Sequence, residues 1–307
     1  MGTDFRIALY SADEMAANGA AQAAFDRVAA LNKVLSDYDP QSELSLLSAT
    51  AGTGPAWHTV SDDLWRVLER SQRLAEASEG AFDVTVGPLT KMWRSARRSK
   101  KFPSDDRMTE AQAAVGYRYL EMNSQTHGVR LVRPNMRLDL GGIGMGFAAD
   151  EALAVLKRRG ITSAMIDASG DVVCSAAPPG ERGWKIGIAP LAENGPPSRY
   201  VWLADGALTT SGDAFQYVEI DGVRYSHIVD PKTGRGLTTR SSVTVTARDC
   251  TTADSLATAV SVLGPERGLK LISATPGTAA LVVCVEDGTV KEYQSPGFKA
   301  EPAAARR

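Results

Sequence analysis

The sequence predicts an α+β fold with mixed or antiparallel sheets flanked by helices. Helical patterns dominate the first third of the chain and strand patterns its second half, so the two kinds of element are partly segregated. A doubly wound parallel fold would instead require strands and helices to alternate regularly. The 307 residues show no internal repeat and no linker-like change in composition, and they leave room for one large domain or for two.

The first third of the chain has two helical patterns and one basic stretch. Apolar residues at three- and four-residue spacing predict a helix over residues 15–37, which the following Asp-Pro dipeptide ends. A second helix is expected over residues 62–79, because Ser61 can cap its N-terminus and Gly80 can end it. The basic, polar stretch over residues 94–107 could bind phosphate, but no aromatic side chains interleave with the charges, so we expect a solvated loop.

The rest of the chain is rich in short strands. A helix over residues 146–159, closed by Gly160, and another over residues 252–262 interrupt them, and a shorter helix follows Pro265. Strands are expected over residues 118–122, 128–132, 136–140, 161–167, 171–176, 183–189, 199–204, 214–220, 223–229 and 242–248. Asp-Gly dipeptides at 221–222 and 287–288 predict hairpin turns. Residues 296–307 are rich in Pro, Ala and Arg, and we expect a flexible tail there.

Composition excludes several classes of protein. The net charge of −2 gives the whole molecule no electrostatic attraction to nucleic acid or to an anionic membrane. No apolar run approaches the roughly 18 residues of a membrane span, and the first residues lack the pattern of a signal peptide. We therefore expect no nucleic-acid partner and no intrinsic membrane span.

Cysteine and histidine are scarce. The three cysteines, Cys174, Cys250 and Cys284, lie far apart, which excludes a CxxC metal or redox site and a disulfide scaffold, and a core role is the default. Only three histidines are present, so a His-rich metal centre is also excluded. Any chemistry must then use mainly oxygen ligands, backbone groups and at most one imidazole.

Two segments suggest a site for a phosphorylated ligand and a metal. At residues 138–147 a strand runs into a glycine-rich turn and then into a helix, whose free N–H groups could bind a phosphate or pyrophosphate. A tight turn below a packed helix explains the glycines equally well. Asp254 and Thr258 lie four apart on one helix face and could bind Mg²⁺, although spacing alone favours a capping cluster.

Two further segments carry candidate functional side chains. His227 ends a hairpin strand close to Asp230, where it could act as a general base or orient a ligand, or could simply be hydrogen-bonded. The ring of Phe82 and the backbone around it could hold an aromatic ligand, and core packing accounts for Phe82 just as well.

Together these segments resemble the FAD:protein FMN transferase family, the ApbE-like flavin transferases. The most specific matches are Ser-Gly-Asp over residues 211–213 and Ser-His-Ile-Val-Asp-Pro-Lys-Thr-Gly over residues 226–234. The matching segments occur in the family's order, over residues 1–3, 36–45, 80–93, 139–150, 211–213, 226–234 and 254–258. Because they must meet around one ligand, the resemblance implies one large domain over residues 1–295, followed by a tail over residues 296–307.

The resemblance implies a ligand set and a reaction. The family moves FMN from FAD to a Ser or Thr hydroxyl of an acceptor flavoprotein, and AMP leaves. Asp254, Thr258 and the carbonyl of Gly142 would bind Mg²⁺. His227 would accept the hydroxyl proton or orient the phosphate, with Asp230 as the second choice. FAD would lie against Met1, Tyr38, Ala81, Phe82, Asp83, Asp139, Met145 and Ile228.

Three departures from the family pattern stand out. Met145 occupies a position where the family often has Lys, and Asp167 one where it often has Asn. The Asn that commonly follows the family's second motif is missing after Ser45. These changes leave the metal pair and the histidine intact, so we expect altered flavin handling rather than a different fold.

Other functions fit the same residues. An Mg²⁺-dependent FAD pyrophosphatase would use water in place of the protein hydroxyl, and a non-enzymatic protein would bind FAD without turnover. A nicotinamide dehydrogenase is disfavoured, because the sequence shows only one strand–helix–strand unit. The resemblance suggests the cell envelope or periplasm, but the chain carries no signal or lipid anchor that would fix its location.

Overall fold

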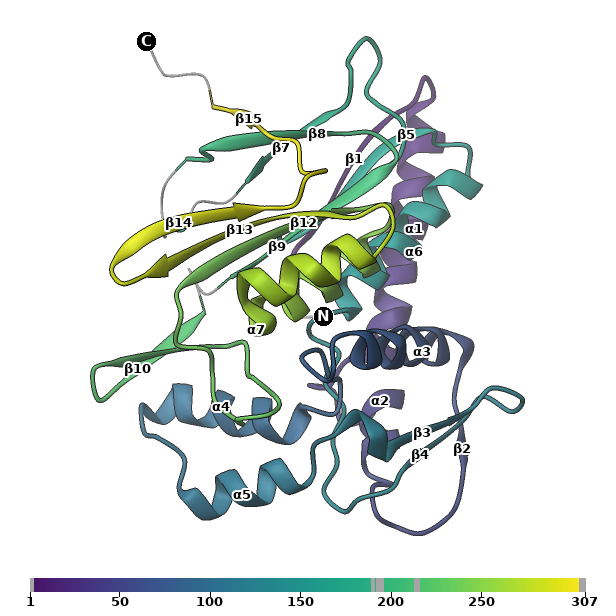
Figure 1. Cartoon of the computed structure of the whole chain (residues 1–307). Coiled ribbons are helices and arrows are strands. Elements are labelled where there is room, and N and C mark those ends of the chain that lie inside the picture. The colour runs from purple at the N-terminus through teal and green to yellow at the C-terminus, as the bar shows by residue number, and fades with distance from the viewer. Residues whose placement is uncertain (1–2, 189–190, 192–195, 213–215, 304–307) are drawn as a thin grey trace.

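A seven-stranded sheet forms the centre of the computed structural model, which describes residues 3–188, 191, 196–212 and 216–303 (Figure 1). All six neighbouring strand pairs of this sheet are antiparallel, which confirms the expected sheet type. In spatial order the strands are β1 (Phe5–Tyr10), β5 (Ser163–Ala168), β6 (Asp171–Cys174), β9 (Gly206–Gly212), β12 (Ser241–Ala247), β13 (Ala279–Glu286) and β14 (Thr289–Gln294).

Three long helices cover one face of this sheet: α1 (Glu14–Leu35), α6 (Gly144–Arg158) and α7 (Cys250–Ala274). Successive side chains of a strand point to opposite faces, so β6 places Val173 in the helix-side core and Val172 in the core of the other face. Gly264 has a φ of 75°, which divides α7 at the break expected before Pro265.

A small three-stranded sheet covers the other face. It consists of β7 (Trp184–Ile188), β8 (Arg199–Leu203) and β15 (Glu301–Pro302). Phe298 is buried in the apolar cluster between the two sheets, and β15 pairs with β8. Part of the segment expected to be a flexible tail therefore packs against the fold, while residues 304–307 lie outside the described residues.

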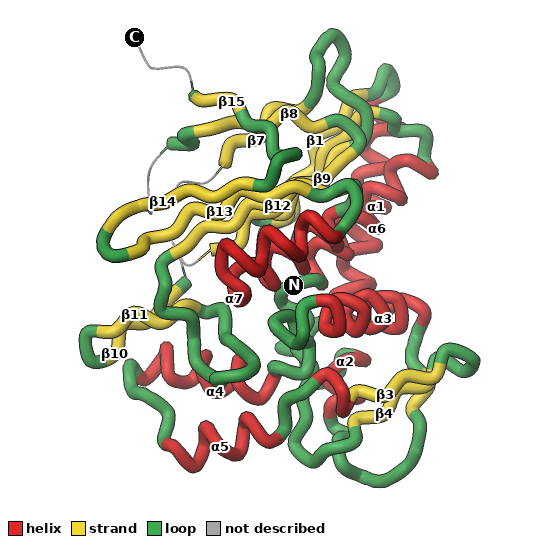
Figure 2. Tube along the Cα trace, in the orientation of Figure 1, coloured by secondary structure: helices red, strands yellow, loops and turns green. Residues whose placement is uncertain are grey.

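The remaining elements form a layer beside the helices (Figure 2). Its helices are α2 (Glu43–Ser48), α3 (Asp62–Ala77), α4 (Gly87–Ser99), α5 (Asp105–Ala113) and the short η1 (Tyr117–Tyr119). Its strands are β2 (His58–Thr59), β3 (Leu120–Asn123), β4 (Gly128–Leu131), β10 (Tyr217–Ile220) and β11 (Val223–Ser226). Asp221 and Gly222 both have positive φ between β10 and β11, as do Asp287 and Gly288 between β13 and β14, which confirms both hairpin turns.

Two expectations about local structure are wrong. Residues 94–99 are not a solvated loop but the second half of α4. Buried Leu89, Met92, Trp93 and Ala96 recur at helical spacing, and their packing outweighs the polar side chains between them. Residues 136–140 are no strand either, since only an isolated parallel bridge joins Arg137 to Val86.

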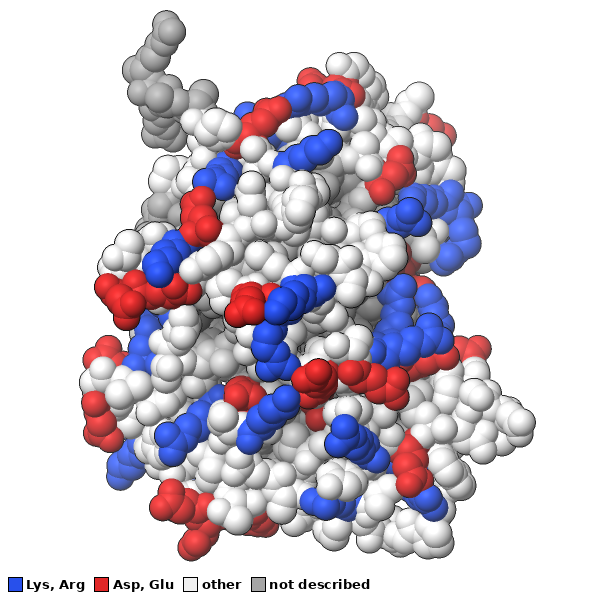
Figure 3. All heavy atoms as spheres, in the orientation of Figure 1, with Lys and Arg blue, Asp and Glu red and all other residues white. Residues whose placement is uncertain are grey.

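The surface and the cysteines agree with the composition. Basic and acidic side chains are interspersed over the face shown in Figure 3, as the near-neutral charge suggests. Within the described part of the chain, no helix is both long and apolar enough to cross a membrane. All three cysteines are free and buried, in agreement with the default core role.

Candidate functional site

The glycine-rich turn before α6 contacts the first turns of α7. The N–H of Gly146 donates to Asp254 Oδ2 at 3.1 Å. A Cβ atom on Gly146 would lie 2.4 Å from the carbonyl oxygen of Cys250, and one on Gly142 would lie 2.8 Å from Thr258 Oγ1. Only glycine at these two positions lets the turn come this close to α7. The close contact places the three predicted metal ligands, Gly142, Asp254 and Thr258, near one another.

Two carboxylates, those of Asp171 and Asp254, are buried where α6, α7 and β6 meet, and the half-buried carboxylate of Asp150 is a third acidic group there. Burial, reinforced by the charge of Asp171, raises the pKa of Asp254 well above its ordinary value. Burial also raises the pKa of Asp171 to about 7, against a hydrogen bond from Thr209, and raises that of Asp150. No Lys or Arg among the described residues forms an ion pair with any of the three. A cation at this place would therefore offset an unfavourable accumulation of negative charge.

The donor set fits a hard divalent cation. One buried carboxylate, one half-buried hydroxyl and one backbone carbonyl are oxygen ligands of the kind that Mg²⁺ takes together with water and phosphate. The described residues contain no group of three or more His, Cys, Asp or Glu side chains that could hold a metal alone. Any metal here would need the backbone, the hydroxyl and the ligand itself.

Asp139 lies at the start of the same turn and is held by α4. Its Oδ2 accepts hydrogen bonds from Arg94 Nη2 at 2.8 Å and from Thr90 Oγ1 at 2.6 Å, and its Oδ1 accepts the N–H of Gly141. Arg94 also binds Asp37, and its guanidinium lies 4.3 Å from the centre of the Tyr38 ring. The structure thus brings Tyr38 and Asp139 together through Arg94.

Charge and burial oppose each other in this cluster. Burial would lower the pKa of Arg94, but the charges of Asp139 and Asp37 outweigh it and raise the pKa. Burial and the charge of Asp139 raise the pKa of Asp37. Tyr38 is 72% exposed, so its ring is available to a ligand.

Residues 81–83 contribute backbone rather than side chains to this region. Ala81, Phe82 and Asp83 are all buried, and the ring of Phe82 lies in the helix-side core. Asp83 accepts hydrogen bonds from the backbone and hydroxyl of Thr85 and from the N–H of Tyr117, and burial raises its pKa. The next carbonyl, that of Val84, accepts the N–H of Asp139 at 2.8 Å, so the segment lies beside the turn.

His227 follows β11 at the end of the hairpin and is exposed. Its backbone N–H and its Nδ1 both lie within hydrogen-bonding distance of the carbonyl of Gln216, at 3.0 and 3.1 Å. A carbonyl can only accept, so the neutral ring carries its proton on Nδ1, and Nε2 is the basic nitrogen. Ile228 is buried next to it.

Asp230 has a local role in the turn after His227. Its Oδ1 accepts the N–H of Lys232 at 2.9 Å, and its carbonyl accepts the N–H of Gly234. The indole N–H of Trp93 donates to the carbonyl of Gly234 at 2.7 Å, and Arg97 reaches the side chain of Gln216. Helix α4 therefore contacts both the Asp139 cluster and the loop that carries His227.

The remaining predicted residues lie around the turn or outside the described chain. Met145 is half-buried in the first turn of α6, and Met1 lies outside the described residues. Asp167 accepts the N–H of Gly170 at 2.9 Å, so its carboxylate closes a turn. Sequence reasoning missed Asp171 and Arg94. A charged residue at the start of the otherwise apolar β6 was the available signal for Asp171.

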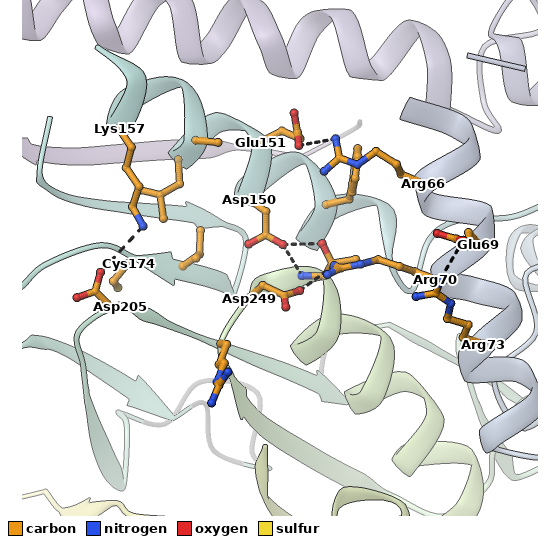
Figure 4. A pocket seen from close by; sticks show the side chains of 16 residues that line it. Arg66, Glu69, Arg70, Arg73, Asp150, Glu151, Lys157, Cys174, Asp205 and Asp249 are labelled. Atoms are coloured by element: carbon orange, nitrogen blue, oxygen red, sulfur yellow. Dashed lines mark hydrogen bonds and ion pairs between the residues drawn. The ribbon is translucent and has the colours of Figure 1, made fainter. Parts of the chain in front are cut away.

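Two pockets of similar size contain none of the predicted site residues. The first, of about 510 Å³, lies where α3, α6 and the start of α7 meet (Figure 4). There Asp150 accepts the N–H groups of Cys250 and Thr251 at 2.8 and 2.9 Å and so anchors the N-terminus of α7. The second, of about 540 Å³, lies between α2, α4 and α5.

The family model and the relatives described here agree on one family. The model of the ApbE family matches residues 1–282. A Vibrio cholerae protein named FAD:protein FMN transferase is 33% identical over 304 residues, which cover 97% of this chain and 90% of the relative. A Treponema pallidum protein of the same name is 33% identical, covering 92% of this chain and 82% of the relative.

Solved structures agree with the sequence comparison. The flavin transferase ApbE from Vibrio cholerae superimposes with a TM-score of 0.83 at 31% identity, covering 97% of this chain and 95% of the other. The ApbE protein from Thermotoga maritima gives 0.84 at 30% identity, over 95% and 94% of the two chains. Another Vibrio cholerae structure is that of a variant in which a histidine is replaced by glycine.

Proposed function

Because this chain belongs to the ApbE family, we propose that it transfers FMN from FAD to a Ser or Thr hydroxyl of an acceptor protein and releases AMP. One observation of the structure supports the proposal independently of the relatives' names. The glycine-rich turn meets the Asp254–Thr258 face of α7 at distances that only glycine allows, which leaves backbone groups and hard oxygen ligands at one spot. A pyrophosphate with its metal needs this combination.

The proposed metal ligands are the carboxylate of Asp254, the hydroxyl of Thr258 and the carbonyl of Gly142. When bound, Mg²⁺ would neutralise charge on the pyrophosphate of FAD as it develops during phosphoryl transfer. The protein supplies the orientation, because the Gly146 N–H holds Asp254 and the close approach of Gly142 holds Thr258.

The proposed flavin-side contacts follow the turn and its neighbours. Tyr38 offers an exposed ring, and Asp139 is fixed by Arg94 and Thr90. Residues 81–83 offer backbone beside Asp139, and half-buried Met145 offers apolar surface near the turn. Ile228 lies in the hairpin loop with its side chain buried. Met145 cannot pair with phosphate, so the metal and the backbone would carry the anionic group.

His227 is the proposed proton acceptor. The acceptor hydroxyl oxygen forms a bond to the phosphorus of the FMN half of FAD, and the bond from that phosphorus to the oxygen of AMP breaks. The hydroxyl proton passes to His227 Nε2, and AMP leaves with the bonding electron pair. Asp230, whose carboxylate closes the adjacent turn, is the second candidate for this role.

The test is incubation with FAD, Mg²⁺ and a peptide of the Asp-Gly-x-Thr-Gly-Ala-Thr type, followed by peptide mass and AMP release. We expect the peptide to gain the mass of FMN. This gain should be absent when EDTA is added, and absent with a peptide whose acceptor Thr is replaced by Val. AMP without peptide modification would establish the pyrophosphatase instead. FAD binding without AMP would establish a non-enzymatic flavoprotein.

A further inference from the structure

The pocket between α2, α4 and α5 has an unusual charge balance. Its basic lining residues are Lys91, Arg98, Arg107 and Arg137, and its single acidic one is Glu110. The whole protein has a net charge of −2, so this accumulation is local. We propose that the pocket is a second ligand site, which binds a small molecule carrying several phosphate groups.

Three of the four basic side chains of this pocket lack protein partners in the part of the chain that the structure describes. Among the described residues, Lys91, Arg98 and Arg107 form no ion pair and no hydrogen bond through their side chains. Arg137 differs from them, because it donates to the carbonyl of Asp37 and its charge also acts on the Asp37 carboxylate. Unpaired cations that face one hollow repel one another, and an anion placed among them would remove that cost.

The pocket of Figure 4 provides an internal comparison. It is almost as large, but five acidic residues balance its five basic ones, and four of the five cations are paired with carboxylates. The pairs are Arg66–Glu151, Arg70–Asp249, Arg73–Glu69 and, at 4.0 Å, Lys157–Asp205. The pocket between α2, α4 and α5 has four basic lining residues and one acidic one, so an anionic ligand there would supply the charge balance that the first pocket obtains from its own carboxylates.

Helix α4 separates this pocket from the proposed FAD site. Lys91, Ser95 and Arg98 recur at four- and three-residue spacing on one face and line the pocket. Arg94 and Arg97 lie on an adjacent face and contact Asp139 and Gln216. The pocket therefore lies on a different face of α4 from the one that contacts the Asp139 cluster.

The shape and lining of the pocket fit a molecule of nucleotide size. Its volume of about 540 Å³ lies within the usual range of small-molecule sites. Buried Met92, Ala114 and Met136 provide an apolar floor, and the polar lining includes Ser95 and Asn135. Arginine guanidinium groups bind phosphate oxygens in a two-pronged geometry, and the several cations of the pocket suit a ligand that carries more than one negative charge.

The experiment measures binding of inorganic tripolyphosphate and of ATP by calorimetry, in EDTA to exclude metal-dependent binding at the Asp254 site. We expect both to bind, and the double variant R98Q/R107Q to weaken each by about tenfold or more, since two charge-assisted contacts are lost. The matched variant K157Q, which removes one cation from the other pocket, should bind both as the wild type does.

The same experiment includes controls that show whether the variants are folded. R98Q/R107Q should have a thermal midpoint no lower than the wild type, because it removes repulsion and breaks no ion pair. D254N should bind tripolyphosphate normally even if it loses flavin transfer, which separates this site from the proposed function. Undetectable binding of both probes, or binding that the double variant leaves unchanged, would overturn the proposal.

Discussion

His227 is the residue on which the proposed chemistry depends most. It is exposed, its Nδ1 is held by the carbonyl of Gln216, and its Nε2 is therefore the basic nitrogen. H227A should abolish FMN transfer, by at least about 100-fold, and leave FAD binding mostly intact, as expected for loss of a general base. Normal transfer by this variant would remove His227 from the mechanism. H58A, which alters a half-buried histidine of β2, is the matched control.

Asp171 should make the metal-free protein less stable at higher pH. Its pKa is raised from 3.8 to about 7, so between these values the native state holds a proton that the unfolded state has lost. Stability contributed by this group is therefore lost as pH rises through that window.

D171N keeps the shape of the side chain without the charge. In EDTA the free energy of unfolding of D171N should exceed that of the wild type at pH 8, by on the order of 4 kcal/mol, and the two should be nearly equal near pH 4. Urea denaturation across this range measures the difference, with D205N, at an exposed aspartate, as control. If the free energy of unfolding of D171N changed with pH in the same way as that of the wild type, the raised pKa of buried Asp171 would be contradicted.

Single residues show where sequence reasoning succeeds. Asp254 and Thr258 lie four apart on one helix, and that local spacing already placed them on a common face. Arg94 could not be recognised, because its partners Asp37 and Asp139 lie 57 and 45 positions away in the chain. Its role depends on tertiary contacts that the basic stretch alone does not reveal.

Among the elements, the crossing of α6 and α7 depends most on a glycine. A Cβ on Gly146 would meet the Cys250 carbonyl at 2.4 Å, whereas one on Gly19 of α1 would have nothing within 4 Å. G146A should lower the free energy of unfolding by about 1–3 kcal/mol through forced displacement of α7. G19A should raise it by about 0.5–1 kcal/mol, since alanine favours a helix interior.

Chemical denaturation of both variants tests the packing of these helices. The two substitutions are chemically identical and differ only in what surrounds the new methyl group. Equal effects of G146A and G19A would show that the glycine turn does not approach α7 as closely as described.

Elements with strong local signals were predictable and the others were not. The long helices α1 and α3 agree with periodicity and caps to within two residues at each end. Helix α4 was mistaken for a loop because its polar half was considered apart from Leu89, Met92 and Trp93. Residues 136–140 have the alternation of a strand, but only the isolated bridge to Val86 pairs them.

On the scale of the whole molecule, the C-terminal segment completes the second core. Phe298 is 7% exposed in the cluster between the two sheets, and β15 pairs with β8. A chain ending at Ser295 should therefore lose about 2–3 kcal/mol of stability, mostly from the phenylalanine. A chain ending at Ala303 should melt as the full chain does. Equal melting temperatures of all three would support a flexible tail over residues 296–307.

The overall architecture could be predicted only as a class. Segregated helices and strands favoured α+β, and the antiparallel sheets confirm it. The order of the seven strands, in which β1 pairs with β5 and β9 joins β6 to β12, depends on contacts between distant segments. Local patterns cannot provide such information, whereas the resemblance to a family implied that distant motifs meet around one ligand.

The central claim is that the glycine turn, α7 and the hairpin loop surround one FAD and its metal. A crystal structure with FAD and Mg²⁺ tests it most directly. We predict the metal at about 2.0–2.1 Å from oxygens of Asp254, Thr258 and Gly142, with the pyrophosphate beside it and His227 facing the FMN phosphorus. A flavin bound instead in the pocket between α2, α4 and α5, or a metal away from Asp254, would contradict the account.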